Sequence, residues 1–275
     1  MYLESAVFEN FRNIEHFPFG FMEGMNIIFG GNAQGKTAVI EGIYLFAGGK
    51  SFRKAKDREM IKNDRLHSQV SIGFSDSRRD HKMTVRTFRD LKKELFINGM
   101  KVKKMSEFVG NFKAVLFCPE HLAIVRDEPS VRRNFIDSAI SQVNPKYLSA
   151  LIEYGKIVEN KNALLRTPEN YSQSEFENLF SLYSQRMAKG SAYITSVRTE
   201  YVHRLFEYVK VFLSEMTCGA DTVSYDYIST AGDVSDISSL ESRYIDLIFG
   251  NAEREKAAKM SLFGAHRDEF DIRIR

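Results

Sequence analysis

The sequence has little cysteine and no long apolar run, and both shortages limit the classes of protein that it can be. Two cysteines in 275 residues, Cys118 and Cys218, cannot form a disulfide framework, so a reducing cytoplasm is the expected compartment. No uninterrupted apolar stretch approaches the roughly 18 residues of a membrane span, and residues 1–4 lack the basic and apolar regions of a secretion signal. With 43% apolar residues the chain is also too hydrophobic for a disordered protein. A globular protein with no membrane partner is therefore expected.

The small net charge of +3 conceals an uneven distribution along the chain. Residues 50–104 hold 17 Lys and Arg against 7 Asp and Glu, a net charge of +10, so the remaining residues carry −7. A basic segment of that size is a candidate surface for phosphate groups. The low total therefore does not exclude a polyanionic partner.

Hydrophobic periodicity predicts a mixed α/β chain in which strands come first and long helices follow. Residues 25–29 are apolar on both faces, as in a buried parallel strand, and residues 114–117 predict a second buried strand. Alternating residues between 68 and 105, with Asn98-Gly99 as a hairpin turn, predict an antiparallel sheet. The other expected elements are strands at 3–7, 17–19, 223–227 and 270–274 and helices at 38–47, 129–143, 145–166, 175–212, 237–249 and 252–260.

The two long helices before residue 212 are joined by a polar loop at 167–174, and this pattern fits two arrangements. One is a helical hairpin that projects from the sheet core. The other is a compact helical subdomain. Periodicity alone does not distinguish between them.

The most specific motif is a glycine-rich run that satisfies G-x-x-x-x-G-K-[ST] in full. It lies between an apolar stretch and an amphipathic helix, which is the context of a nucleotide-binding loop. Its backbone N–H groups would surround a triphosphate, Lys36 would contact the β- and γ-phosphates, and Thr37 would ligate Mg²⁺. The alternative is a glycine-rich turn with a solvated lysine. The motif consists of Gly30, Gly31, Asn32, Ala33, Gln34, Gly35, Lys36 and Thr37.

The motif does not name the base, but the rest of the chain favours ATP over GTP. A GTPase would carry N-K-x-D, and the nearest approach, at residues 160–163, has Ala163 in place of the carboxylate. ATP with Mg²⁺ is therefore the expected cofactor. No zinc site is expected, because His121 and His266 have no metal-ligand spacing with either cysteine.

Several further motifs follow one another along the chain. Together with the glycine-rich loop they resemble the RecF family of bacterial recombination-repair ATPases, which is related to the structural-maintenance-of-chromosomes family. That resemblance implies ATP binding, contact with double-stranded or gapped DNA, a homodimer that forms around nucleotide, and recombinase loading at gapped DNA with the mediator RecR. The motifs are Asn-Phe-Arg-Asn at 10–13, Glu-Gly-Ile-Tyr-Leu at 41–45, Ser-Phe-Arg at 51–53, Ile-Asn-Gly at 97–99, Val-Leu-Phe-Cys-Pro-Glu at 115–120, Arg-Arg-Asn-Phe-Ile-Asp at 132–137 and His-Arg-Asp at 266–268.

The resemblance assigns roles to single residues, each beside a structural alternative. Arg12 and Asn13 would contact the nucleotide, or they form a turn held by an Asn side chain. Arg53 would reach nucleotide or DNA, or it belongs to a solvated basic surface. Glu120 would sense the γ-phosphate or cap the next segment. The His-Arg-Asp element at 266–268 would lie at a nucleotide or dimer contact, whereas an isolated histidine is more often structural.

The basic segment is predicted to contact DNA phosphates without reading bases, with an affinity that falls as salt rises. Solvated strand faces are the alternative for any one lysine. The candidates are Arg53, Lys54, Lys56, Arg58, Lys62, Arg78, Arg79, Arg86, Arg89, Lys92 and Lys93.

The expected fold is α/β, an ABC-type P-loop ATPase lobe with an antiparallel β subdomain and an inserted α-helical lobe. Residues 1–128 would form the ATPase lobe with the basic sheet, residues 129–215 the helical lobe, and residues 216–275 a return to the ATPase lobe. In the resembled family an Asp-Glu strand motif and a Ser-Gln-Gly signature follow the His-Arg-Asp element, and neither occurs here. We therefore expect the chain to bind ATP and to hydrolyse it poorly. The alternatives are another chromosome-maintenance-like ATPase, a nucleotide-independent scaffold for DNA or RecR, and a phosphoryl-transfer enzyme with a small substrate.

Overall fold

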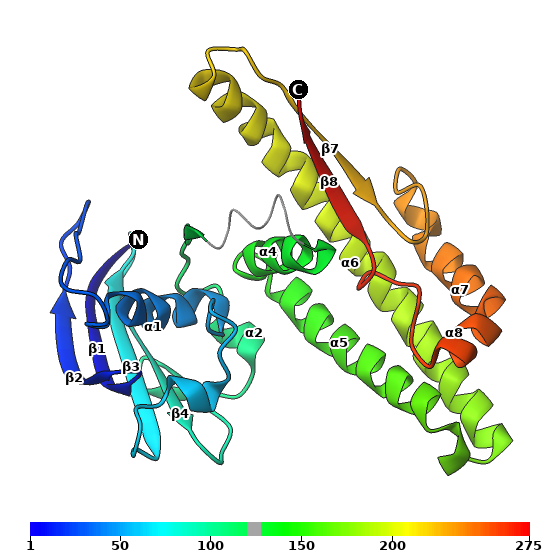
Figure 1. The fold of residues 1–275 in the computed structure, drawn as a ribbon, viewed down its shortest axis with the longest axis horizontal. Helices are drawn as coiled ribbons and strands as arrows, with labels where there is room; N and C mark the ends of the chain where they lie inside the picture. The colour runs from blue at the N-terminus through cyan, green and yellow to red at the C-terminus, as the bar shows by residue number, and fades with distance from the viewer. Residues whose placement is uncertain (120–127) are drawn as a thin grey trace. The chain divides into compact units, whose positions relative to one another are not determined.

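A computed structural model describes residues 1–119 and 128–275. The chain divides into two compact units (Figure 1). Unit 1 contains residues 1–116 and 141–145, and unit 2 contains residues 117–140 and 146–275. Across the described part of the chain, no helix is both long and apolar enough to cross a membrane.

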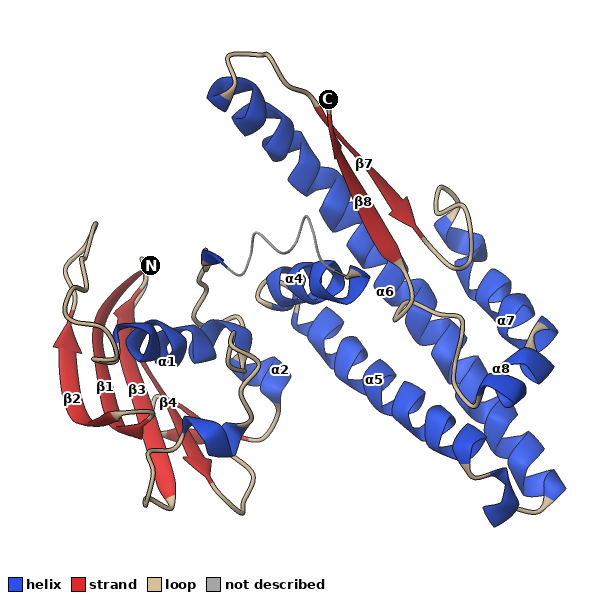
Figure 2. Ribbon diagram, in the orientation of Figure 1, coloured by secondary structure: helices blue, strands red, loops and turns tan. Residues whose placement is uncertain are grey.

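Unit 1 is built on a six-stranded antiparallel sheet (Figure 2). The spatial order is β2-β1-β3-β4-β5-β6, so neighbouring strands are mostly joined by hairpins. Asn98 and Gly99 both have positive φ, 50° and 82°, as the predicted hairpin turn requires. The antiparallel sheet expected between residues 68 and 105 is thus confirmed. The strands are β1 (Tyr2–Phe11), β2 (Ile14–Gly20), β3 (His67–Ser75), β4 (Asp80–Phe88), β5 (Glu94–Ile97) and β6 (Met100–Val102).

Helix α1 (Lys36–Gly48) covers one face of this sheet. Its buried side chains include Val39, Leu45 and Phe46, and they pack with buried strand residues such as Phe8 and Ile72. Gly49 ends the helix in the left-handed conformation at φ 69°, and its N–H donates to the Leu45 carbonyl. The short helix α2 (Met105–Phe108) adds Phe108, which packs on Phe46.

Two buried strands expected from the sequence do not form in the structure. Residues 25–29 and 114–117 have no strand partner among the described residues. Met25 is 88% exposed, Phe29 89% and Val115 97%. Apolar composition correctly marks segments that favour burial, but a strand also needs a neighbour to pair its backbone groups. No described residue pairs with either segment, so both predictions are wrong for the described part of the chain.

Unit 2 is organised around an antiparallel pair of long helices, a pairing that both arrangements expected from the sequence contain. Helix α5 (Pro145–Arg166) lies beside the 44-residue helix α6 (Gln173–Met216), and Tyr154 of α5 hydrogen-bonds with Ser191 of α6. Ser172 and Glu175 form a capping box that begins α6. The shorter elements are α4 (Pro129–Ser141), β7 (Val223–Ile228), α7 (Leu240–Gly250), α8 (Ala252–Ala258) and β8 (Glu269–Ile274).

The C-terminal residues pack against the helices of unit 2. Strands β7 and β8 form their own antiparallel pair, and Tyr225 of β7 lies against Phe206 of α6 with ring centroids 4.3 Å apart. Val223 and Phe270 belong to the same buried cluster as the α6 core. Residues 216–275, which the sequence assigns to the ATPase lobe, are therefore part of unit 2 in the structure. The apolar faces of these strands find their burial on α6, and this contact sets the division.

Candidate nucleotide-binding site

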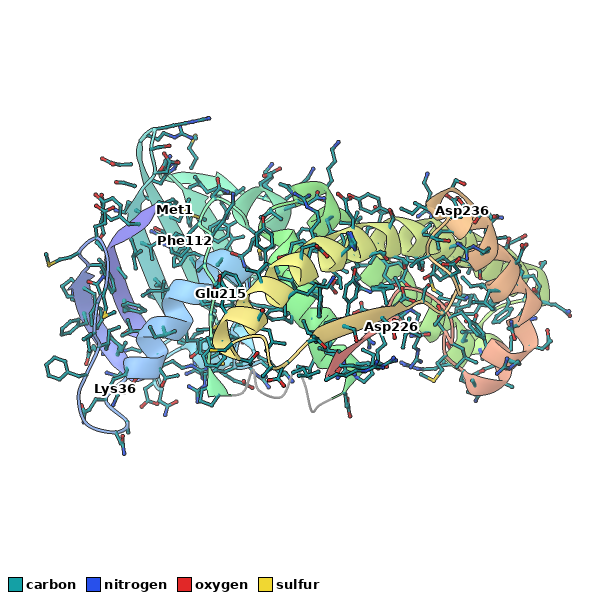
Figure 3. The ribbon with its side chains drawn as sticks, turned by 90° about the horizontal axis from the view of Figure 1, so that it is seen from above. Met1, Lys36, Phe112, Glu215, Asp226 and Asp236 are labelled. Atoms are coloured by element: carbon teal, nitrogen blue, oxygen red, sulfur yellow. The ribbon has the colours of Figure 1, made fainter. Side chains whose placement is uncertain are left out.

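The glycine-rich loop leads directly into α1, where Lys36 is the first helical residue (Figure 3). Gly30, Ala33 and Gly35 have φ of 151°, 61° and 94°, so the backbone turns through the left-handed region three times in six residues. Such turns aim successive N–H groups to one side, and the start of α1 adds the positive end of the helix dipole. There is no acidic residue in the first turn of α1. The local geometry therefore suits an anion.

Two backbone carbonyls of the glycine-rich loop hold the side chain of Lys36 in place. Its Nζ donates to the carbonyls of Gly30 at 2.8 Å and Gly31 at 2.7 Å. Both bonds are exposed, and the ammonium retains a third donor for a phosphate oxygen.

A cavity of about 760 Å³ opens beside the loop, within the size range of small-molecule sites. Six loop residues that the sequence singles out line it, and so does Ala38. Of the predicted motif, Gly30 and Gly31 lie outside the lining and serve as acceptors for Lys36. The complete lining is Arg12, Asn13, Asn32, Ala33, Gln34, Gly35, Lys36, Thr37, Ala38, Arg53, Glu59, Ile61, Lys62 and Asn63.

Asn13 connects the β1–β2 turn to the glycine-rich loop. Its Nδ2 donates to the Ala33 carbonyl at 2.8 Å. A Cβ at Gly35 would lie 3.0 Å from Asn13 Oδ1, so the two segments approach as closely as a glycine allows. The sequence leaves open a structural and a functional role for Asn13. The side chain holds the loop in shape and also lines the cavity.

Arg12 and Arg53 form the cationic wall of the cavity, and the buried carboxylate of Glu41 lies behind them. Arg12 donates to Glu41 through two nitrogens, and Arg53 Nη1 lies 3.8 Å from a Glu41 oxygen. The 3₁₀ helix η1 (Asp57–Met60) supplies Glu59, whose carbonyl accepts from Arg12 Nη1 at 2.7 Å. The sequence reasoning missed Glu41, Glu59, Ile61 and Asn63 as parts of the site. An acid within the otherwise apolar stretch 38–47 was the available signal for Glu41. Residues 59–63 are brought in by backbone pairing with the β1–β2 turn and carry no local signal.

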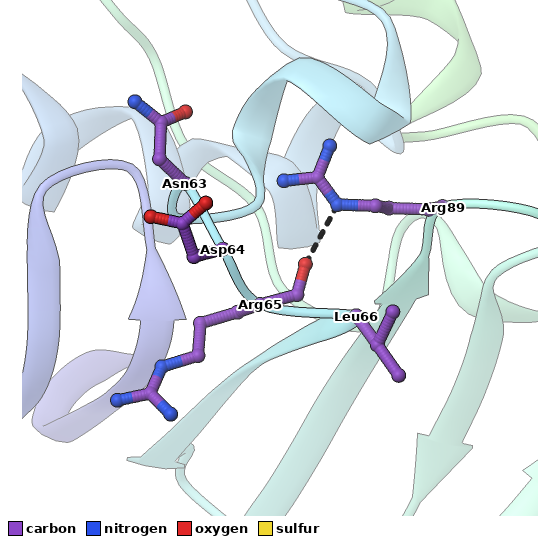
Figure 4. Close-up of a pocket in the computed structure, with 5 residues that line it drawn as sticks. All are labelled: Asn63, Asp64, Arg65, Leu66 and Arg89. Atoms are coloured by element: carbon purple, nitrogen blue, oxygen red, sulfur yellow. Dashed lines mark hydrogen bonds between the residues drawn. The ribbon is translucent and has the colours of Figure 1, made fainter.

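A second hollow of about 560 Å³ adjoins the first, since Asn63 lines both. Its other residues are Asp64, Arg65, Leu66 and Arg89 (Figure 4). Arg89 Nε donates to the Arg65 carbonyl at 2.7 Å, which ties the segment after Asn63 to the loop after β4. The second hollow therefore carries two arginines beside one acid, Asp64, and Arg65 pairs with Glu15.

The predicted DNA-contacting residues fall into two groups. Arg78 and Arg79 occupy the exposed turn between β3 and β4, whereas Lys92 and Lys93 lie in the loop after β4, at the other end of that hairpin. The segment 53–58, with Arg53, Lys54, Lys56 and Arg58, lies at the Lys92 end, because Lys93 bonds to Asp57 and to the Gly49 carbonyl. The Lys93 ammonium therefore already makes contacts within the protein. The assignment of all these residues to DNA remains a prediction.

The residues present fit ATP with Mg²⁺ that arrives with the nucleotide. Thr37, the predicted metal contact, lines the cavity beside Lys36. Among the described residues no three His, Cys, Asp or Glu side chains converge as a metal site. A Mg²⁺ ion held by the Thr37 hydroxyl would therefore take its remaining ligands from phosphate oxygens and water.

The His-Arg-Asp element lies in unit 2 and makes internal contacts there. Asp268 is fully buried and accepts from Thr195 at 2.6 Å and from Tyr227 at 3.0 Å. The Tyr154 hydroxyl lies 2.8 Å from His266 Nδ1, and burial lowers the pKa of His266 to about 4. These contacts give both side chains a structural role, and the nucleotide or dimer role stays a prediction. Glu120 lies outside the described residues.

These features define a P-loop ATPase domain: the sheet, the helix that follows the glycine-rich loop, and the cavity that the loop lines. A family model described as "AAA domain" matches residues 7–208. Relatives extend this match over the whole chain. The DNA replication and repair protein RecF of Clostridium perfringens is 32% identical, over 99% of this chain and 73% of the relative. The protein of the same name from Clostridium acetobutylicum is also 32% identical, over 100% and 74%.

A solved structure described as the recombination mediator protein RecF-ATP in the RecFOR pathway is 29% identical and superposes with a TM-score of 0.92. The superposition covers 99% of this chain and 73% of that chain. The chain belongs to the RecF family. The predicted family and the α/β P-loop fold are both confirmed.

Proposed function

We propose that this chain is an ATP-binding and DNA-binding protein of recombinational repair and replication-fork maintenance in the cytoplasm. It would act as an ATP-dependent homodimer that helps to load recombinase at gapped DNA together with a RecR-type mediator. The observation that carries the proposal is the cavity built from the glycine-rich loop, Asn13 and the cationic wall of Arg12 and Arg53. The names of the relatives, which refer to replication, repair and a RecF–ATP complex, support the same conclusion.

The lining of the cavity also supports slow hydrolysis by this chain. Glu59 is its one acidic residue among those described, and the Glu59 carboxylate accepts from the Lys56 N–H at 3.0 Å as part of the η1 cap. Hydrolysis needs a group that orients the attacking water. Since the described lining holds no other carboxylate, we propose that the chain binds ATP and turns it over far more slowly than the roughly 1 s⁻¹ at the low end of ordinary enzymes.

Calorimetric titration of the chain with Mg–ATP tests the proposal. Lys36→Ala should weaken ATP binding at least about tenfold, because it removes the charge-assisted contact to the phosphates. Lys189→Ala, which removes an exposed lysine from α6 in unit 2, is the matched control and should bind like the wild type. Equal affinity of the wild type and Lys36→Ala would contradict the nucleotide site.

A further inference from the structure

One buried carboxylate lies behind the cationic wall of the nucleotide pocket. Glu41, in the second turn of α1, is fully buried. A carboxylate removed from water is tolerated only with compensating donors. Glu41 receives them from two other segments, namely Arg12 in the β1–β2 turn and Ser51 in the loop after α1.

Arg12 is fixed by every contact that it makes. Its Nε donates to one Glu41 oxygen at 2.9 Å, and its Nη2 donates to the other at 2.6 Å. Nη1 donates to the Glu59 carbonyl at 2.7 Å, and the backbone N–H donates to the Met60 carbonyl at 2.8 Å. This two-point pairing with a carboxylate orients the guanidinium plane as well as neutralising the charge. Two of its five N–H donors remain for a ligand in the cavity.

Arg53 touches the same carboxylate but is held weakly. The distance from Arg53 Nη1 to Glu41 Oε2 is 3.8 Å, which is an ion-pair distance and too long for a hydrogen bond. Its side chain is 50% exposed, against 21% for Arg12. Arg53 can therefore leave Glu41 at little cost, whereas Arg12 cannot.

We propose that Glu41 is a positioning residue for the nucleotide pocket: it holds Arg12 in one fixed orientation and leaves Arg53 free to move to a phosphate group. This inference rests on the proposed ATP function. Arg12 then contributes to ATP affinity only when Glu41 orders it, and Arg53 contributes whether or not Glu41 is charged. When Glu41 orders the Arg12 side chain before ATP binds, the entropy cost of immobilising that side chain is no longer part of the binding free energy.

Glu41→Gln is the main variant, because it keeps the size of the side chain and removes the charge that fixes Arg12. It should weaken Mg–ATP binding about tenfold in calorimetric titration. The matched control is Glu255→Gln in unit 2, where an equally buried carboxylate pairs with the buried Lys161 at 2.6 Å. The control should lose thermal stability comparably and bind ATP like the wild type.

Two double-variant cycles separate positioning from a general loss of structure. Arg12→Gln can still donate to Glu41, and it should weaken ATP binding about tenfold both alone and together with Glu41→Gln. Arg53→Ala should weaken binding by a factor that multiplies with that of Glu41→Gln. Glu41→Asp, which keeps the charge on a shorter side chain, should bind ATP more tightly than Glu41→Gln, and it allows the same cycle if the Gln variant does not fold.

Three results would overturn the positioning role: wild-type affinity in Glu41→Gln, an equal loss of affinity in Glu255→Gln, or losses for Arg12→Gln and Glu41→Gln that multiply. Failure of the proposed function looks different, because then the wild type itself binds no ATP or Lys36→Ala binds as well as the wild type. The two hypotheses therefore fail by distinct measurements.

Discussion

Gly42 lies inside α1, where glycine normally weakens a helix by about 1 kcal/mol relative to alanine. The reason for a glycine here is its contact with the sheet. A Cβ at this position would lie 2.3 Å from the ring of Phe8, which is fully buried in β1. The close approach brings α1, and with it the nucleotide loop, onto the sheet.

Gly42→Ala should therefore destabilise the chain despite the better helix propensity of alanine. Overpacking a filled core costs about 1–3 kcal/mol, which exceeds the gain of about 1 kcal/mol from propensity. Gly155→Ala in α5 is the control: nothing lies within 4 Å of its added Cβ, so this variant should gain up to about 1 kcal/mol. Urea unfolding of both variants measures the difference, and equal stabilisation by the two would refute the packing argument.

Among the secondary-structure elements, the segment between α8 and β8 depends on a neutral histidine. The Tyr154 hydroxyl lies 2.8 Å from His266 Nδ1, and His266 Nε2 lies 3.3 Å from the Ser261 carbonyl. Since a carbonyl only accepts, the proton belongs on Nε2, and Nδ1 accepts from Tyr154. Burial is the largest cause of the lowered pKa of His266, followed among the lowering causes by the charge of Arg267.

This network predicts an acid-sensitive unit 2. The pKa of His266 falls from 6.5 to about 4 on folding, so between these pH values the unfolded chain binds a proton that the folded chain does not. Stability should then fall as pH drops from about 6.5 to about 4, by on the order of 3 kcal/mol in total. Unfolding followed across this pH range should show a flatter profile for His266→Gln. An unchanged slope in that variant would mean that other groups cause the acid sensitivity.

Elements whose signals are local were predictable from the sequence, and those that depend on distant partners were not. The glycine-rich loop, the Asn98-Gly99 hairpin and the α5–α6 pair follow from spacing, turn chemistry and periodicity. The expected strands at 25–29 and 114–117 failed because composition indicates burial but cannot supply a pairing strand. In the site, the motif gave the phosphate loop. Glu59 and Asn63 come from a segment about 47 to 50 residues after Arg12 and Asn13, which an isolated β-bridge and backbone hydrogen bonds bring near.

On the scale of the whole molecule, the +10 segment is not one surface. Arg78 and Arg79 lie in the turn at one end of the β3–β4 hairpin, and Lys92 lies in the loop at the other end. Strand β4 has nine residues, and at about 3.3 Å per residue it separates the two groups by about 30 Å. The basic residues beside the nucleotide pocket belong to the Lys92 end.

The distance between the two basic groups sets the minimum length of duplex DNA that can contact both. Since B-form DNA rises about 3.4 Å per base pair, one straight duplex that touches both ends of the hairpin must span about nine base pairs. Fluorescence anisotropy with a series of duplexes should show affinity rising up to that length, and the dependence on salt should become steeper at the same point. Arg78→Glu with Arg79→Glu should weaken binding of long duplexes and leave a six-base-pair duplex unaffected. Equal weakening at every length would mean that short DNA binds at the turn rather than at the pocket end. The length of the β3–β4 hairpin would then not set the length of duplex that the protein prefers.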